Sequence, residues 1–314
     1  MKIIPQVRFP NAQLSRIPRR EHFNQVPQDI FESVVPKTVS RFKHIKLKIA
    51  EKMYNTEFTP SSKGYGEYSY RAFVFDKKTD KPVEVVVKPR IFDEMEEEYL
   101  ILDPHNAVTA ETIARSGGIC CSFNKENWGM PVVGMRDFFY DNKNNDIVSG
   151  VMNSYGRNEY EGLGFIEHQM TVERFLMSKR KNLDIFSVPS AYFFHKNCGF
   201  EVIKHNDEFN AQTLEQLVNN CIEQSKLDRA TIEKLLVCRK ITKDEYLVDI
   251  NSTFENIIKH LYKEHKSLKG FNYFCLDMKL SKKALKEWEK IIEKHPIFMG
   301  KKMPDKIRPK GISQ

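Results

Sequence analysis

The stretch from residue 147 to residue 203 constrains the fold of this chain most strongly. It begins as an apolar strand, passes through the bend Gly162-Leu163-Gly164, and continues as a helical pattern from Phe165 to about Lys181. A second apolar run and a short helix follow, and Gly199-Phe200 opens another strand. Strands that alternate with helices at these lengths predict a domain in which helices pack on a sheet.

Two β-hairpins are predicted in the same half of the chain. The runs 68–75 and 83–87 have the composition of strands and are joined by a polar turn. The runs 132–140 and 147–152 are joined by a second polar turn. Alternating apolar residues on both sides of such turns indicate antiparallel strand pairs.

Helices are predicted at both ends of this region. Thr38 is the expected N-cap of a first helix, and a final strand at 272–280 precedes a last helix capped by Ser281. Between about residues 210 and 266 the pattern is helical almost throughout. The prediction of the first helix is based on apolar residues at steps of three and four, namely Val39, Phe42, Ile45, Ile49 and Met53.

Composition excludes several classes of protein. Hydrophobic residues make up 40% of the 314 residues, which is enough for a core and excludes wholesale disorder. The mean hydropathy is −0.52, and no apolar stretch approaches the roughly 18 residues of a membrane helix. The net charge of +8 is spread along the chain rather than gathered in one block, so a nucleic-acid partner is not expected.

The amino-terminal residues 1–37 form a basic segment rich in proline and arginine. Residues 1–20 carry Lys and Arg side chains and no acid, a composition that a transit peptide shares. However, Pro5, Pro10 and Pro18 would break the amphipathic helix that a transit peptide needs. An extended arm is therefore the favoured interpretation.

The cysteines predict neither a metal centre nor a disulfide framework. They are Cys120, Cys121, Cys198, Cys221, Cys238 and Cys275. No C-x-x-C pair is present, and the adjacent pair lacks the spacing of zinc ligands. Scattered cysteines without an export signal indicate reduced thiols, so we expect a cytoplasmic protein without a metal.

One segment carries a recognisable motif. Residues 191–201, AYFFHKNCGFE, resemble the A-x-x-F-Y-x-K-x-G-F-E signature of the GNAT family of N-acetyltransferases. The residues at matching spacing are Ala191, Phe194, Gly199, Phe200 and Glu201. Upstream, Gly162-Leu163-Gly164 resembles the end of that family's R/Q-x-x-G-x-G/A loop.

The resemblance implies a mixed, mostly antiparallel sheet flanked by helices, an α+β fold, with acetyl-coenzyme A held where two neighbouring strands part. It implies that Val151, Met152 and Asn153 hold the pantetheine arm of this co-substrate. A helix N-terminus with small residues offers amides to a pyrophosphate. The residues implied at that group are Arg157, Tyr160, Glu161, Gly162, Leu163, Gly164 and Phe165, with Phe194 beside them.

The resemblance also implies an activity, N-acyl transfer by direct attack of an amine on the thioester. Such a reaction needs a base for the ammonium and an acid for the departing thiolate. His195 stands where the family has its tyrosine acid, and an imidazolium of pKa about 6.5 could protonate a thiolate. Tyr192, one turn earlier, is the second candidate. The acceptor is expected to be a small-molecule amine or a protein lysine.

Two residues depart from the family's pattern, and they leave alternatives open. Glu159 stands at the R/Q position, where a carboxylate would repel phosphate, and His195 replaces the tyrosine. The chain is then either a divergent acyltransferase or a catalytically decayed, GNAT-like basic adaptor for a protein or nucleic acid. A third alternative is a different α/β enzyme, because Gly199-Phe200 is also the pattern of a helix end followed by a buried aromatic.

The predicted domain organisation follows the extent of the resemblance. The acyltransferase-like domain covers residues 38–206 and 268–280, and residues 207–267 between them form an added helical subdomain. Residues 281–314 form the final helix and a basic tail. We expect the helical insertion, together with the arm, to select the acceptor or to bind a protein partner.

Overall fold

A computed structural model describes residues 41–91, 96–111, 129–268 and 274–303. The predicted arm, the predicted cap Thr38 and the end of the basic tail lie outside the described residues. No helix in these ranges combines the length and the apolar character that crossing a membrane requires.

The body of the molecule is a mixed, nine-stranded sheet with the order β6-β1-β2-β3-β4-β5-β7-β12-β8. All of its strand pairs are antiparallel except that of β5 with β7. This is the predicted α+β fold. The strands are β1 (Tyr70–Asp76), β2 (Pro82–Ile91), β3 (Glu96–Leu102), β4 (Val132–Asp141), β5 (Asp146–Asn153), β6 (Tyr160–Glu161), β7 (Asn182–Ser187), β8 (Phe200–Val202) and β12 (Leu276–Leu280).

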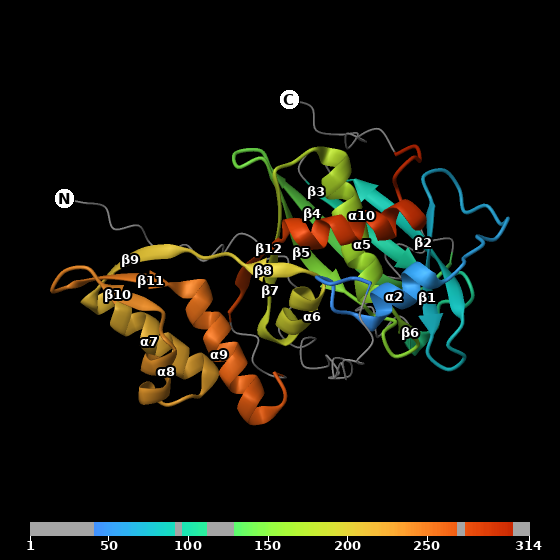
Figure 1. Ribbon diagram of the computed structural model, residues 1–314. Helices are drawn as coiled ribbons and strands as arrows, with labels where there is room; N and C mark the ends of the chain where they lie inside the picture. Colours follow the sequence, from blue (N-terminus) through green and yellow to red (C-terminus); the bar gives the residue numbers. More distant parts are fainter. Residues whose placement is uncertain (1–40, 92–95, 112–128, 269–273, 304–314) are drawn as a thin grey trace, which may run out of the picture.

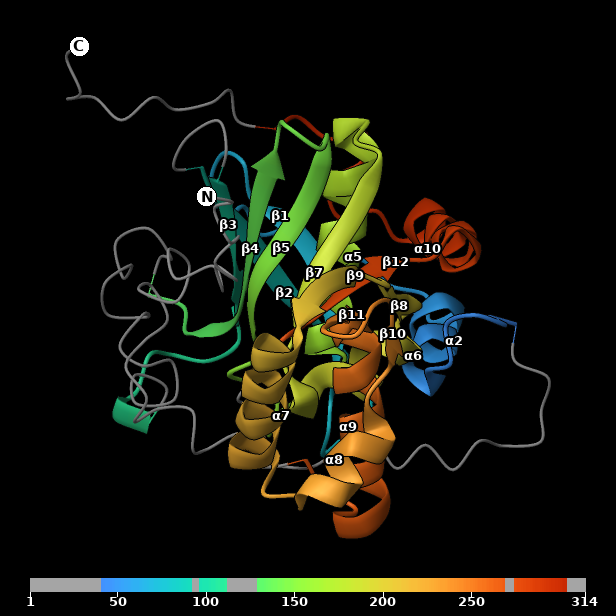
Figure 2. The same cartoon turned by 90° about the vertical axis from the view of Figure 1, so that its left-hand side faces the viewer.

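Three helices, α2 (Lys48–Asn55), α5 (Leu163–Ser178) and α10 (Lys282–Lys294), lie on one face of this sheet (Figures 1 and 2). Helix α5 is the central one, and its first ten residues are buried apart from Gly164. Phe165 of α5 stacks on Trp288 of α10 with ring centroids 4.6 Å apart. The main apolar core therefore lies between the sheet and these helices.

Both predicted hairpins are confirmed, as β1 with β2 and as β4 with β5. Strand β3 was not predicted, because it begins with consecutive glutamates. Two of these acids are paired: Glu97 accepts from Arg174 of α5 at 2.7 Å, and Glu98 accepts from Arg90 of β2 at 3.0 Å. Charges that are paired across elements allow a strand that its own composition disfavours.

The structure corrects the predicted first helix. Helix α2 begins only at Lys48, and residues 41–47 are not helical, although Phe42 and Ile45 are buried. The amides of His44 and Ile45 donate to the carboxylate of Glu287, at 2.9 and 2.7 Å. These long-range bonds replace the ones that a helix would provide.

The inserted segment forms a lobe beside the main sheet (Figure 1). It consists of β9 (Asn206–Asn210), α7 (Ala211–Ser225), α8 (Arg229–Leu235), β10 (Cys238–Lys240), β11 (Glu245–Asp249) and α9 (Ile250–His265). Its strands form a second sheet, β10-β11-β9. The prediction that the segment is helical almost throughout is therefore wrong for these strands, which are too short and too exposed to produce an alternating apolar pattern.

Helix α9 joins the lobe to the body. Ile257, Ile258 and Leu261 are fully buried and belong to the same apolar cluster as the main sheet. The side chain of Asn251 donates to the carbonyl of Ile203 at 2.9 Å, directly after β8. This helix therefore shares the main core.

Candidate functional site

Strands β5 and β7 part from each other halfway along their length. Their parallel pairing extends from Asp146–Asn182 to Ser149–Ile185 and no further, although β5 continues to Asn153. Beyond this point β5 stays with β4, whereas β7 stays with β12 through Ser187. On the side that faces β7, Val151, Met152 and Asn153 thus have no strand partner among the described residues.

A β-bulge lies at the same position. Arg136 of β4 pairs with Met152, whereas Phe138 pairs with Ser149, so two residues of β5 stand opposite the single residue Asp137. The hydroxyl of Ser149 donates to the carbonyl of Asp137 at 2.8 Å and holds this arrangement. Bulges turn backbone groups out of the ladder and are frequent beside active sites.

The loop after β5 leads to the N-terminus of α5. The amides of Glu159 and Tyr160 donate to the carbonyl of Gly156, at 3.1 and 2.9 Å. Tyr160 and Glu161 then form β6 and pair with β1. The amide of Tyr160 is therefore engaged within the loop, which removes it from the predicted anion-binding amides.

The first turn of α5 supplies those amides. The N–H groups of Leu163, Gly164 and Phe165 have no acceptor within a helix at these positions. No acidic residue occupies this turn. The positive end of the helix dipole is therefore not neutralised by a side chain of the turn itself.

Both glycines of the bend also have a packing role. Gly162 has φ +98°, a left-handed conformation that glycine adopts without strain, and it faces Ile49 of α2. A Cβ on Gly164 would lie 2.9 Å from the Phe194 ring. The close approach of α6 (Tyr192–Asn197) to α5 thus requires glycine independently of any ligand.

The side chains of Tyr160 and Glu161 are bound elsewhere. The Tyr160 hydroxyl donates to Asp103 at 2.5 Å, and its pKa is raised by burial and by this carboxylate. Glu161 accepts from Lys52 of α2 at 3.1 Å. Arg157 is partly buried, and burial lowers the pKa of its guanidinium. Of these loop side chains, Arg157 is the one whose charge suits a phosphate.

His195 lies in the core beneath α5. Its Nδ1 and the Nε2 of His168 are 2.9 Å apart, and both rings are buried. Burial, together with the charge of Arg136, lowers the pKa of His195 to about 3. The imidazole is therefore neutral near pH 7, which does not fit the predicted role of an imidazolium acid. His168 was not singled out from the sequence, because a lone histidine in a helix carries no distinguishing pattern.

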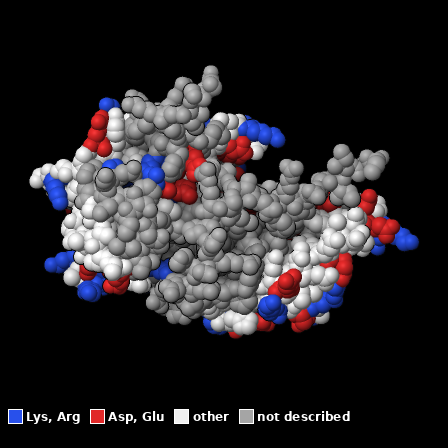
Figure 3. All heavy atoms as spheres, turned by 180° about the vertical axis from the view of Figure 1, so that it is seen from behind, with Lys and Arg blue, Asp and Glu red and all other residues white. Residues whose placement is uncertain are grey.

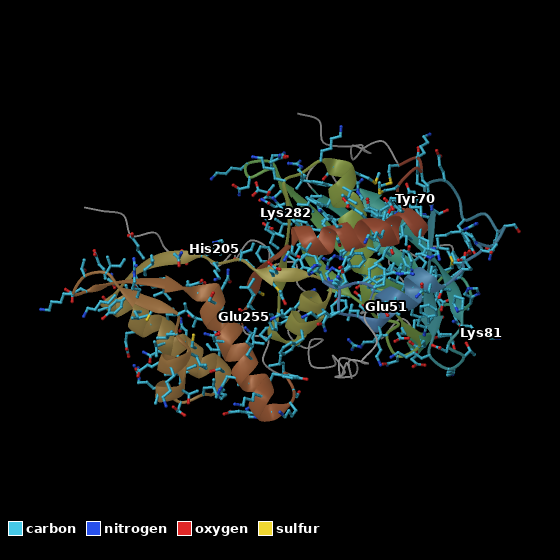
Figure 4. All side chains as sticks on the ribbon, in the orientation of Figure 1. Glu51, Tyr70, Lys81, His205, Glu255 and Lys282 are labelled. Atoms are coloured by element: carbon cyan, nitrogen blue, oxygen red, sulfur yellow. The ribbon has the colours of Figure 1, made fainter. Side chains whose placement is uncertain are left out.

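Tyr192 connects α6 to the inserted lobe. Its hydroxyl donates to Glu255 of α9 and accepts from Lys196 at 3.0 Å. Burial, followed by the hydrogen bond to Glu255, raises the pKa of this phenol. Figure 4 shows Glu255 on the side of α9 that faces α6. The neutral phenol of Tyr192 can donate its proton to a ligand only if its hydrogen bond to Glu255 breaks.

A buried polar network behind the loop was also missed in the sequence. Arg136 is 1% exposed and donates to Thr171 at 3.0 Å. Glu167 is fully buried, and its carboxyl accepts from Ser154, the first residue after β5, at 3.0 Å. Burial raises the pKa of Glu167 to about 8. This network attaches the start of the loop to α5. The sequence pattern that could have revealed it is the presence of charged residues at positions that face the core.

A cavity of about 300 Å³ adjoins the same loop. Tyr155, Gly156 and Tyr160 form one side of it, and Val132 and Val133 of β4 form another. Its charged lining residues in the described chain are the acids Asp103, Glu111 and Glu159. Such a lining favours a cation. Within the described ranges, no group of acids, histidines and cysteines is arranged to hold a metal ion.

The sequence matches no protein-family model and no curated protein. Among solved structures, the chain is similar to nourseothricin acetyltransferase, with 13% identity and a TM-score of 0.25. The match covers 45% of this chain and 75% of that chain. A likeness this distant does not indicate which residues of this chain act.

Proposed function

We propose that this chain is an acyl-coenzyme A-dependent N-acyltransferase that acetylates an amine. The observation that carries the proposal is the parting of β5 from β7 after Ser149 and Ile185, followed along the chain by a loop, strand β6 and the N-terminus of α5. A strand edge without a partner beside a helix N-terminus suits a ligand that has an amide-containing arm and a pyrophosphate.

The residues then have distinct roles. The backbone of Val151, Met152 and Asn153 binds the pantetheine arm as a neighbouring strand would. The first-turn amides of α5, with Arg157 and the remainder of the bend, bind the pyrophosphate. Phe194 closes the α6 side of this bend, where its ring contacts Gly164.

In the proposed reaction, the nitrogen of a deprotonated amine attacks the thioester carbonyl carbon. The new C–N bond forms, the C–S bond breaks, the nitrogen releases one proton, and the thiolate takes up a proton. Tyr192 is the proposed proton donor, since His195 is held neutral in the core. The acidic cavity beside the loop favours an acceptor that arrives as an ammonium, whether a small-molecule amine or a protein lysine.

Thermal unfolding with and without acetyl-coenzyme A tests the proposal. A ligand at 100 times its Kd stabilises the folded state by about 2.7 kcal/mol, so a clear rise in Tm is expected. Arg157→Gln should reduce this rise, and Gly164→Glu should abolish it by placing a carboxylate at the helix N-terminus. Arg229→Gln, an exposed arginine of the inserted lobe, is the control and should leave the rise unchanged.

Each variant is compared with its own unfolding temperature without cofactor, because Gly164→Glu also presses on Phe194. An unchanged Tm of the unmodified protein at millimolar acetyl-coenzyme A would contradict the proposal.

The second candidate is a non-catalytic adaptor with the same fold. The neutral, buried His195 and the engagement of Tyr192 with Glu255 favour it, because both candidate acids are committed to structural contacts. Figure 3 shows acidic and basic side chains interspersed on the described surface of the lobe, which suits a protein partner better than a polyanion. This candidate predicts no cofactor-dependent rise in Tm.

A further inference from the structure

A second cavity lies away from the parting of β5 and β7. It has a volume of about 750 Å³ and is lined by the loop 58–69, the start of β1, the first half of α5 and residues 294–301. Three strands separate β1 from β5 in the sheet. Tyr70, at the start of β1, lies beside the end of α10 and contacts Phe298 (Figure 4). The volume is within the range of small-ligand sites.

The lining of this cavity is positively charged. Its charged groups are Arg71, Lys294 and Lys301, and none of the described lining residues is acidic. Burial lowers the pKa of Lys301, the charge of Glu173 opposes this shift, and the charge of Arg71 adds to it. Two cations thus approach each other at one side of the cavity.

Each of these cations has an acid nearby, and Glu57 accepts from Lys294 at 3.0 Å. Glu84, at 3.9 Å from Arg71, accepts from the amide and the hydroxyl of Ser61, at 2.7 and 2.8 Å. Glu173 accepts the amides of Ile297 and Phe298, at 2.8 and 2.6 Å. These acids keep their negative charge, but none of them lines the cavity, so the described lining itself presents only positively charged groups.

Aromatic rings form the apolar part of the lining. Phe58 stacks on Phe73 with centroids 4.9 Å apart, and Tyr65 and Tyr70 also line the cavity. His295 packs edge-on against Phe73 at 5.2 Å, and its buried Nε2 has no hydrogen-bond partner among the described residues. Flat apolar walls suit a planar ligand.

We propose that this cavity binds a small aromatic anion whose carboxylate or phosphate lies between Arg71 and Lys301. The ring of the ligand packs against Phe58 and Tyr65 of the lining. This site is separate from the proposed acyltransferase site and does not depend on it.

Calorimetric titration with phenyl phosphate and benzoate tests the proposal. Benzyl alcohol and benzylamine are the comparison ligands, because they keep the ring and remove or reverse the charge. We expect both anions to bind and both comparison ligands to fail. Lys301→Gln should weaken binding about tenfold, since a charge-assisted hydrogen bond is lost.

Lys302→Gln is the matched control, because Lys302 is exposed, pairs with Glu67 and does not line the cavity. Equal binding of benzyl alcohol and benzoate, or equal effects of the two lysine substitutions, would overturn the proposal. Displacement of phenyl phosphate by acetyl-coenzyme A would also overturn it, because the anion would then occupy the other site.

Discussion

At the scale of single residues, buried acids hold backbone segments that have no regular structure. Glu287 is 6% exposed and accepts the amides of both His44 and Ile45. Glu173 does the same for residues 297–299. A buried amide that loses its acceptor retains the cost of its desolvation. These carboxylates are therefore structural and not candidates for catalysis.

Replacing Glu287 tests this role. Glu287→Ala should lower the free energy of unfolding by about 2 kcal/mol, because two backbone donors lose their acceptor. Glu289→Ala, two residues along the same helix and partly exposed, is the control and should cost much less. Urea unfolding at pH 7 measures the free energy of unfolding of both variants. Equal decreases would show that the effect comes from a change in the helix and not from the lost hydrogen bonds to residues 44 and 45.

The buried histidine pair makes stability depend on pH. The pKa of His195 is about 3 in the folded protein, against about 6.5 in an unfolded chain. The unfolded state therefore binds more protons between these values, and stability falls as the pH falls below 6.5. This histidine contributes at most about 1.4 kcal/mol per pH unit.

Unfolding free energies at pH 6.5 and 4.5 measure this dependence. His195→Gln should make the fall in stability less steep, whatever its effect at pH 6.5. The control is His205→Gln, which alters a half-exposed histidine beside Asp277. If the unfolding free energy of His195→Gln fell with pH as steeply as that of the unmodified protein, other groups would be responsible for the loss of stability at low pH.

At the scale of elements, the contact between α6 and α9 connects the helix that carries the motif residues to the inserted lobe. The hydroxyl of Tyr192 bonds to Glu255, and Lys196 and Lys259 lie 3.6 and 2.8 Å from the same carboxylate. Phe193 of α6 also packs against Tyr262 of α9, with centroids 4.5 Å apart. The two helices should therefore be energetically coupled.

A double-mutant cycle of Tyr192→Phe and Glu255→Gln measures that coupling. The expected coupling energy is on the order of 1 kcal/mol, because the hydrogen bond is partly buried and charge-assisted. The exposed pair Arg229 and Glu215 is the control cycle, for which at most about 0.5 kcal/mol is expected. Additive effects for Tyr192 and Glu255 would show that the lobe is not coupled to α6 through this bond.

At the scale of the whole molecule, the inserted lobe can be divided. Helix α9 contacts β8 and β12 of the main sheet, whereas β9, α7, α8, β10 and β11 form an outer part (Figure 1). Val218, Cys221 and Ile232 of this outer part still belong to the same apolar cluster as α9. Asn206 and Asp249 are strand partners, so the two ends of the outer part lie next to each other. The outer part can therefore be removed without removing α9.

Replacing residues 207–248 by two glycines tests whether this part selects the acceptor. We expect the rise in Tm with acetyl-coenzyme A to persist, because the proposed cofactor site is not touched. Release of coenzyme A thiol, measured with poly-lysine and with spermidine as acceptors, should fall. Turnover that stays unchanged would contradict the assignment of acceptor selection to the lobe.

The sequence alone predicted the elements whose patterns are local. Both hairpins, helix α5 and the cap of α10 follow from alternation, apolar spacing and Ser281, which accepts the amide of Ala284 at 3.2 Å. The candidate loop could be found because glycines at a helix start leave a readable signal within a few residues.

Only the tertiary structure decided the features that depend on distant partners. Residues 41–47 lose their helix to Glu287, and the glutamates of β3 become a strand through Arg90 and Arg174. The burial of His195 depends on His168 and Arg136, which come from other elements. Local pattern sets which conformation a segment prefers, but hydrogen bonds and charges brought from far along the chain decide whether the segment keeps it.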